Sequence, residues 1–490
     1  MGIGRISVAV LAAVLIIAST VQLWRTSNGV RTERVILADS PATVYRPTAA
    51  QEAPLAIVAH GFGGSRQMME ALSRTLARSG FAVVAFDFIG HGRHGGLLSP
   101  EVGRIEGTTA QLVAQTVAVA RAARDLPGMA PGPVTYLGHS MATDIAIRAA
   151  QDLGDAASIV AISMYSEAVT ADFPERLLVV SGEWEARLRT VGLRVLHQID
   201  PTAPEGETVQ AGAVFRRTIA APYTEHVGVL YSPVTLREAR DWALAAMPGA
   251  GPSGVIAATG PWVAGLLFGI VLAGWPLAGL VPLRAREPCR MPARAFALAL
   301  AVPVLPAAGA MAALAGAGSV AGFVPIAAFL GAWGGAQLIV LIWAGWRPGG
   351  IDPRGVAMLL IWGLVFALVM DRVGGAFVPT GPRAGLLAVL LVGAVPFAVA
   401  DAALAYGAPV WRRVVARVLV LIVLGAVMVL VPARLGVTFT VLPVMVLFWL
   451  VYGSFARWIA ARAGPVTAAT GTAVWLAWSI AATTPLFAVP

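Results

Sequence analysis

The sequence contains one cysteine, Cys289, and no lysine, so all of its 35 basic residues are arginines. A single cysteine excludes an internal disulfide bond and a cysteine-rich metal site. Charged residues make up 12% of the chain and hydrophobic residues 58%, whereas an average soluble domain is about 25% charged and roughly 45–50% apolar. This composition indicates that the chain is not an ordinary soluble protein over its whole length.

The few charges are concentrated in one part of the chain. Residues 25–250 carry a charge every few positions, whereas 1–24 and 255–490 are apolar runs with short arginine-bearing or Gly/Pro-rich connections. A helix needs about 20 consecutive apolar residues to cross a bilayer core. We therefore expect a transmembrane anchor in 1–24, a globular domain in 25–250 and a transmembrane domain of about eight helices in 255–490.

The first predicted span is 6–23, which we interpret as an uncleaved anchor because no A-x-A-like cleavage site follows it; a cleaved signal peptide is the alternative. Eight further spans are expected, and the two within 418–455 could instead form one hairpin or a broken helix. These spans are 258–282, 295–315, 321–345, 356–370, 385–406, 418–432, 438–455 and 466–487.

The arginines between the spans predict an orientation. With a cytoplasmic N-terminus, twelve arginines fall in inner loops and three in short outer loops. The inner ones are Arg5, Arg284, Arg286, Arg290, Arg294, Arg347, Arg354, Arg412, Arg413, Arg417, Arg457 and Arg462, and the outer ones are Arg372, Arg383 and Arg434. Loops rich in arginine or lysine remain on the cytoplasmic side of a membrane. The globular domain is therefore expected outside the cytoplasm, in a bacterial periplasm. The net charge of +9 is then a topology signal, and we expect no nucleic-acid partner.

The globular segment alternates short apolar strands with helices. A hairpin is expected from 33–38 and 42–46, and helices are expected up to about Arg78, over 108–124 and over 143–151. This alternation predicts a mostly parallel sheet covered on both faces, with ligands bound beyond the carboxyl ends of its strands. The other strands are expected at 55–59, 81–86, 134–137, 158–163, 177–181 and 213–219.

Ser140 follows the 134–137 strand in a Gly-x-Ser-x-Ala turn that leads directly into a helix. A serine on such a tight turn projects its hydroxyl clear of the sheet, as a nucleophile requires. Gly138 fits this motif, and Ala142 replaces the second glycine with only one added methyl group. Ser140 is thus the predicted nucleophile. The alternative is that Ser140 is only a buried serine at the start of a helix.

Three further polar or glycine-rich segments follow predicted strands: His60–Gly64, Asp87–Gly92 and His226–Leu230. Together with the Ser140 turn, these segments resemble the α/β-hydrolase superfamily over about residues 33–247. The resemblance implies that the amides of Phe62 and Met141 form an oxyanion hole, with His60 and Gly61 as further candidates in the same loop. It also implies that His226 is the catalytic base. The alternative is that His226 is only an exposed histidine in a loop. The resembling segments occur in the superfamily's order at 60–64, 87–92, 138–142 and 226–230.

The acid of the implied triad is less sharply defined. The superfamily places it in a Gly-x-x-Asp pattern after the penultimate strand, and Glu185 occupies that position here. A glutamate is an accepted variant of this acid. Glu183 is the near alternative, and Glu167, after the preceding strand, is a more distant one.

Other chemistries have little support in the sequence. His91 and His94 have the spacing of a metal pair, but no third ligand is apparent nearby, and we expect neither a metal nor a cofactor. A serine in the nucleophile position disfavours reactions that need a carboxylate nucleophile. Only about a dozen residues separate the strands at 158–163 and 177–181, so little or no lid is expected. An unlidded site close to membrane lipid favours a lipid-like or small acyl substrate.

The helical half matches no family by its motifs. The pairs Gly318/Gly322 and Gly331/Gly335 are typical of close helix packing. Pro303, Pro306 and Pro396 predict kinks. Asp401 lies inside a predicted span, where a carboxylate is either functional or reaches back to the interface.

The sequence therefore predicts a membrane-anchored serine hydrolase that cleaves an ester, thioester or amide. An acyltransferase would use the same three side chains. A transporter or scaffold, with the hydrolase-like domain as a binding or regulatory module, is an alternative of a different class.

Overall fold

The computed structural model describes residues 2–102, 104–247, 251, 254–285, 291–435 and 438–489. Cys289, Arg286, Arg290 and the side chain of Arg434 lie outside the described residues. The chain forms two compact units. The α/β unit comprises Ala18–Gly265 and Arg372–Ala376, and the helical unit comprises Met1–Ile17, Leu266–Asp371 and Phe377–Pro490.

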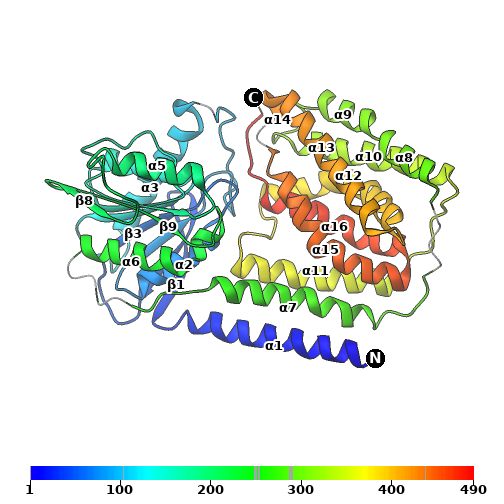
Figure 1. The fold of residues 1–490 in the computed structure, drawn as a ribbon, viewed down its shortest axis with the longest axis horizontal. Coiled ribbons are helices and arrows are strands. Elements are labelled where there is room, and N and C mark those ends of the chain that lie inside the picture. The colour runs from blue at the N-terminus through cyan, green and yellow to red at the C-terminus, as the bar shows by residue number, and fades with distance from the viewer. Residues whose placement is uncertain are drawn as a thin grey trace. The chain divides into compact units, whose positions relative to one another are not determined.

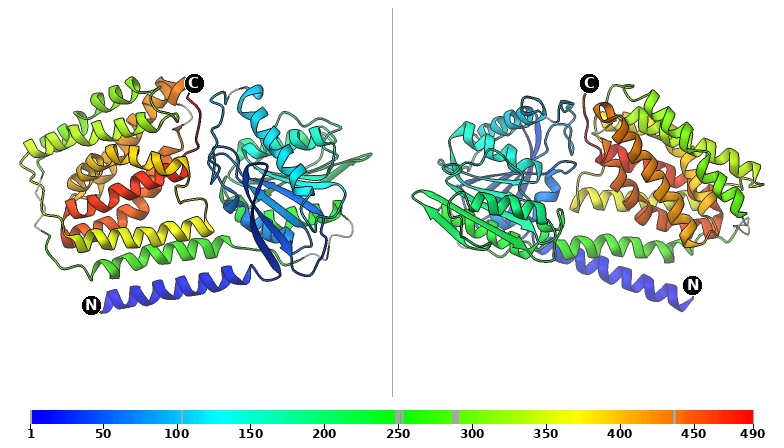
Figure 2. Two further views of the ribbon diagram at one scale, coloured as in Figure 1. Left: turned by 180° about the vertical axis from the view of Figure 1, so that it is seen from behind. Right: turned by 45° about the horizontal axis from the view of Figure 1, so that its top comes forward.

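The α/β unit is built on a nine-stranded sheet with the order β1-β2-β4-β3-β5-β6-β7-β9-β8 (Figure 1). The six strands from β4 to β9 in this order pair in parallel, and the antiparallel β1–β2 and β8–β9 hairpins form its two edges (Figure 2). The strands are β1 Val30–Leu37, β2 Ser40–Pro47, β3 Leu55–Ala59, β4 Ala82–Phe86, β5 Val134–His139, β6 Ala156–Ile162, β7 Arg176–Gly182, β8 Thr208–Ala211 and β9 Val214–Ala221.

The predicted mostly parallel sheet with helices on both faces is confirmed. The central strands are buried along their whole length because α2 and α6 cover one face and α3, α4 and α5 the other. The short strand β8 was not predicted, since most of its residues are exposed and no apolar pattern marks it. The helices are α2 Glu70–Ala77, α3 Ala110–Arg124, α4 Met141–Leu153, α5 Ala186–Leu196 and α6 Pro233–Ala246.

The connection between β6 and β7, residues 163–175, is described throughout and contains no helix, which confirms the prediction of little or no lid. Its backbone is organised by Arg216, a fully buried side chain on β9. The Arg216 guanidinium donates hydrogen bonds to the carbonyls of Thr170 and Pro174, among others. Burial lowers the pKa of Arg216 to about 10, so the side chain stays charged at neutral pH.

One segment from the C-terminal half of the chain belongs to the α/β unit. Arg372 forms an ion pair with Glu70 at 3.2 Å, and the amide of Ala376 donates to the Ser65 hydroxyl at 2.9 Å. The peptide 372–376 thus covers the start of α2, although more than a hundred residues separate it from the rest of the unit.

Among the described residues, nine helices are long and apolar enough to cross a membrane. The pair within 418–455 consists of two helices, each long enough to count as a span of its own. The helix at 293–313 breaks at Pro303, as predicted for this proline. The nine are α1 Ile3–Arg25, α7 Gly260–Ala278, α8 Ala293–Ala301 with α9 Val304–Ala313, α10 Phe323–Trp343, α11 Pro353–Val373, α12 Pro382–Ala405, α13 Val410–Leu430, α15 Val441–Ala463 and α16 Pro465–Thr483.

The glycine pairs behave differently from each other. Gly318 and Gly322 take positive φ values of 100° and 87° in the connection before α10, so their assignment to helix packing is wrong. Gly331 does approach α12, because a Cβ there would lie 3.5 Å from the Cα of Gly393. Gly335 has no atom of another segment within 4 Å of an added Cβ, so it does not take part. Two other glycines do: a Cβ on Gly334 would lie 2.3 Å from the Phe397 nitrogen of α12, and one on Gly393 would lie 2.0 Å from the Ala327 carbonyl oxygen of α10.

Candidate active site

The sheet order brings two loops together at the carboxyl ends of β3 and β5. Chain order reverses at this point, because β3 pairs with β4 on one side and with β5 on the other. Ala59 is paired with Gly138, so the residues that follow both strands leave the sheet at the same level. The same edge carries the ends of β6, β7 and β9.

Ser140 lies on a sharp turn between β5 and α4, with φ 54° and ψ −121°. This conformation is strained for a residue with a side chain; the Ser140 amide donates to the carbonyl of Ile162 at 2.8 Å. A Cβ on Gly138 would lie 2.4 Å from the carbonyl oxygen of Ala142, so only glycine fits there. Ala142 itself is fully buried and fits the turn without a second glycine.

His226 lies in the loop that follows β9, and its Nε2 is 2.9 Å from the Ser140 Oγ. The main chain of His226 is held by His139, whose Nε2 donates to the His226 carbonyl at 2.8 Å. Burial lowers the pKa of His139 to about 4, so this neighbour is neutral at physiological pH. The pKa of His226 is shifted in the opposite direction, upward.

Glu185 completes the group of three side chains, with its Oε1 2.5 Å from the His226 Nδ1. Its other oxygen, Oε2, accepts from the Ser163 hydroxyl at 2.7 Å and from the Gly182 amide at 2.6 Å. Burial opposes ionisation of Glu185, but these hydrogen bonds outweigh it and lower the pKa of the carboxyl. The hydrogen bond to Glu185 in turn raises the pKa of His226.

The two alternative acids lie elsewhere. The Glu183 Oε2 accepts from the amide of Tyr223 at 2.7 Å and so joins the loops after β7 and β9. Glu167 is exposed on the connection between β6 and β7. Among the carboxylates of the described chain, Glu185 is the one in contact with the His226 ring.

The loop after β3 packs directly against Ser140. A Cβ on Gly61 would lie 2.8 Å from the His139 ring and 3.0 Å from the Ser140 Cβ, so Gly61 has no room for a side chain. The Gly61 carbonyl accepts from the His60 Nδ1 at 2.8 Å and from the Gly64 amide at 3.0 Å. Because the N–H of a trans peptide points opposite to its C=O, the Phe62 amide points away from His60. The Met141 amide belongs to the first residue of α4.

His60 is a structural residue in this arrangement. It is buried, and its Nε2 accepts from the amide of Phe88 at 3.1 Å while its Nδ1 donates to Gly61. Both ring nitrogens are therefore used in one neutral tautomer. Burial lowers the pKa of His60, which stabilises that neutral form.

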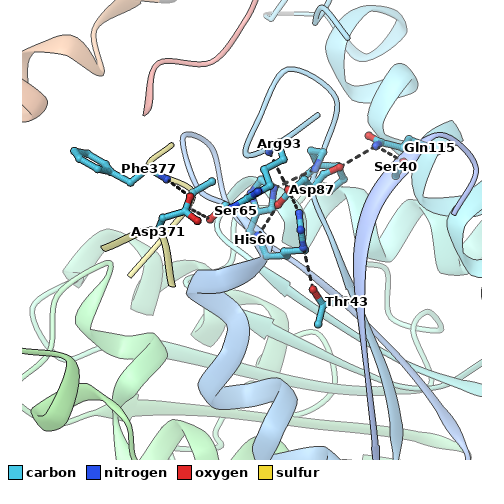
Figure 3. A network of polar contacts seen from close by, with 12 residues as sticks. Ser40, Thr43, His60, Ser65, Asp87, Arg93, Gln115, Asp371 and Phe377 are labelled. Carbon is cyan, nitrogen blue, oxygen red and sulfur yellow. Dashed lines mark hydrogen bonds and ion pairs between the residues drawn. The ribbon is translucent and has the colours of Figure 1, made fainter. Parts of the chain in front are cut away.

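The turn after β4 is organised around the buried carboxylate of Asp87 (Figure 3). It forms an ion pair with Arg66 and accepts from the Arg66 amide at 2.8 Å and the Arg93 amide at 2.9 Å. Gln115 donates to the Asp87 carbonyl and to the Ser40 hydroxyl. Asp87 thus fixes the loops beside the site and does not contact His226.

Sequence reasoning did not identify Ser163 and Gly182 as partners of Glu185, nor His139 as the support of the His226 loop. A readable signal existed for Ser163, since it directly follows a fully buried strand end and so reaches the same edge as Ser140.

In the part of the chain that the structure describes, no group of three or more His, Cys, Asp or Glu side chains could hold a metal ion. His91 and His94 use their Nδ1 atoms within their own loop, toward the Ile89 carbonyl and the Gly96 amide.

Residues 51–202 match the family model described as serine aminopeptidase, S33. No curated protein matches the chain. Among solved structures, the chain is similar to TT1662 from Thermus thermophilus, with 21% identity over 45% of this chain and 99% of that one and a TM-score of 0.33. It is also similar to a dienelactone hydrolase from Anabaena variabilis (17% identity, 44% and 99% covered, TM-score 0.33) and a hyperthermophilic esterase from Pyrobaculum calidifontis (16%, 49% and 90%, 0.33).

Proposed function

Because residues 30–246 form an α/β-hydrolase domain, we propose that the protein is a membrane-anchored serine hydrolase that cleaves carboxylic esters through an acyl-enzyme on Ser140. The observation that carries this proposal is the continuous chain of contacts from Glu185 through His226 to Ser140. The nine apolar helices and the arginine distribution support a membrane location with the α/β unit on the periplasmic side.

In the proposed reaction the Ser140 Oγ attacks the ester carbonyl while the His226 Nε2 takes the hydroxyl proton. Glu185 accepts from the His226 Nδ1–H, which keeps Nε2 free to act as the base and stabilises the imidazolium that forms. The amides of Phe62 and Met141 donate to the oxyanion. His226 returns its proton to the leaving alcohol, and water, activated by the same imidazole, then releases the acid from Ser140.

The surroundings of the three side chains support an apolar acyl substrate. Four large side chains on the loops after β6, β7 and β9 are exposed to solvent: Tyr165 (59%), Trp184 (67%), Tyr223 (81%) and Val227 (42%). We call them the apolar rim. Trp184 and Val227 directly adjoin Glu185 and His226, and the amide of Tyr165 bonds to Thr143 in the first turn of α4. Exposed aromatic groups beside a site without a lid favour a lipid-like or long-chain ester.

The first experiment is labelling of the full chain in detergent and in intact spheroplasts with a membrane-impermeant fluorophosphonate probe. We expect the wild type to be labelled in both and Ser140→Ala in neither. Ser163 is the other serine in contact with Glu185, and its replacement by alanine could also reduce labelling. Mass spectrometry of the labelled wild-type peptide therefore identifies which serine carries the probe. Absence of labelling of the wild type in detergent would refute the proposal.

The substrate class is tested with p-nitrophenyl esters of increasing chain length. Trp184→Ala combined with Tyr223→Ala is expected to raise KM for long-chain esters about tenfold, with little effect on acetate, since about 1–3 kcal/mol of apolar contact is lost. Ile36→Ala removes an equally exposed apolar side chain on the edge strand β1 and is the matched control. An equal effect on acetate and long-chain esters would contradict the assignment of the rim.

A further inference from the structure

A partly open cavity of about 330 Å³ is formed by α12, α13, α15 and α16 of the helical unit. Its charged lining comes from three of these helices. Asp401 is on α12, Arg413 and Arg417 are one turn apart on α13, and Arg457 is on α15. The cavity therefore brings together three guanidinium groups and one carboxylate that are up to 56 positions apart in the sequence.

One of the three arginines is neutralised within the cavity. Arg417 donates to both oxygens of Asp401, at 3.1 and 2.9 Å, and its guanidinium lies 5.3 Å from the centre of the Trp449 ring. This pair accounts for Asp401, which the sequence alone left between a functional and an interfacial role. Among the described residues, no carboxylate pairs with Arg413 or Arg457, so the lining keeps two uncompensated positive charges.

Most of the remaining wall is apolar, and Tyr406 and Thr472 are its polar members. Phe397, Phe448, Trp449 and Leu476 line the same cavity, along with several alanines. An apolar, aromatic wall does not contribute to the binding of a small hydrated anion. A ligand with a charged group and a hydrocarbon portion matches both parts of the lining.

A topology signal alone does not account for this placement. Arg294 and Arg354 begin α8 and α11 on the predicted inner side; like Arg457 they are exposed, but neither lines the cavity. They serve a positive-inside signal equally well. Arg413 and Arg417 instead share one face of α13, because residues four apart in a helix are neighbours.

We propose that this cavity binds the phosphate headgroup of an anionic lipid, with Arg413 and Arg457 as the phosphate ligands and the aromatic side chains against the start of its acyl chains. Arginine suits this task because its planar guanidinium donates two parallel hydrogen bonds to phosphate. The Arg417–Asp401 pair remains intact in this proposal. The site is independent of the proposed hydrolase activity.

The test is native mass spectrometry of the full chain in nonionic detergent, titrated with dioleoyl phosphatidylglycerol or dioleoyl phosphatidylcholine. We expect the wild type to bind the anionic lipid about tenfold or more tightly than the zwitterionic one. Arg413→Gln with Arg457→Gln should weaken binding of phosphatidylglycerol about 10- to 100-fold, because two charge-assisted contacts are lost. The matched control, Arg294→Gln with Arg354→Gln, removes the same charge outside the cavity and should bind like the wild type.

Unchanged affinity in the Arg413/Arg457 variant, or equal loss in the control, would overturn the proposal. Glycerol 3-phosphate distinguishes the lipid from a free phosphate: we expect no competition at millimolar concentration, and competition as strong as that of the lipid would overturn the lipid assignment. Size-exclusion chromatography and circular dichroism check folding. If the glutamine variant does not fold, Arg413→Lys with Arg457→Lys decides, since it keeps the charge and loses the paired donors; an unchanged lipid affinity there would refute the site.

Discussion

Replacing Glu185 with glutamine tests the proposed hydrolase mechanism most directly, because the surroundings of this carboxyl dictate how the amide must turn. The Gly182 amide is an obligate donor 2.6 Å from the Glu185 Oε2. The side-chain oxygen of the introduced glutamine must face it, since an NH₂ group there would place two donors against each other. The NH₂ group then faces the His226 Nδ1, which lies 2.5 Å from the carboxylate in the wild type.

An NH₂ donor at that position forces the His226 Nδ1 to accept, so the ring proton moves to Nε2, toward Ser140. In this tautomer His226 cannot take the serine proton. The corresponding change in a serine protease lowers kcat about 10⁴-fold, which is about 5.5 kcal/mol of transition-state stabilisation at 1.36 kcal/mol per factor of ten. We expect a loss of about 10³- to 10⁴-fold here.

The assay is hydrolysis of p-nitrophenyl butyrate by the full chain in detergent, with Glu183→Gln and Glu167→Gln as matched controls. Both controls should keep activity within about threefold of the wild type, because neither carboxylate contacts His226. Ser163→Ala should lower kcat by about 3- to 10-fold, since it removes one hydrogen bond of about 1 kcal/mol to Glu185. A tenfold or smaller loss in Glu185→Gln, with a large loss in Glu183→Gln, would refute the geometry.

Three further predictions concern pH and stability. The proposed mechanism needs neutral His226, whose pKa is raised by the Glu185 hydrogen bond. We therefore expect kcat/KM to fall with decreasing pH around a midpoint above 6.5, and a midpoint below 6 in a pH–rate profile would contradict this. Gly138→Ala should cost about 1–3 kcal/mol and abolish probe labelling, because its methyl group meets the Ala142 carbonyl, and thermal unfolding that matches the wild type would exclude this clash. Asp87→Asn should cost about 3–5 kcal/mol in chemical denaturation by leaving Arg66 buried without its counter-charge, and a loss below 1 kcal/mol would show that the pair contributes little.

Much of the α/β unit could be predicted because its strands are short, apolar and followed by polar or glycine-rich turns. The bounds of β3 and the existence of the β1–β2 hairpin follow from this pattern. The bounds of the hairpin do not: its strands span 30–37 and 40–47 instead of 33–38 and 42–46, because Leu37 already pairs with Ser40. The strand β8 does not, because four mostly exposed residues carry no periodic signal, and it forms only by pairing with β9.

The choice among the glutamates could not be made from the sequence. Glu183 and Glu185 are two positions apart on one loop, so spacing alone does not decide which one faces His226. Contacts across the sheet decide it: the Tyr223 amide holds Glu183, while Ser163 and Gly182 hold Glu185. In the helical unit the same limit applies to Arg413 and Arg457, since an apolar pattern predicts helices but not which of their faces meet around a cavity.

The peptide 372–376 has a consequence for the order in which the protein is made. The ribosome completes the whole sheet and α6 before it has synthesised α7 to α11, and only then does Arg372 become available to Glu70 and Ala376 to Ser65. At roughly 5–20 residues per second, many seconds separate these events. During that interval the start of α2 lacks the contacts of residues 372–376, so the α/β unit can be completed only after α7 to α11 have been synthesised.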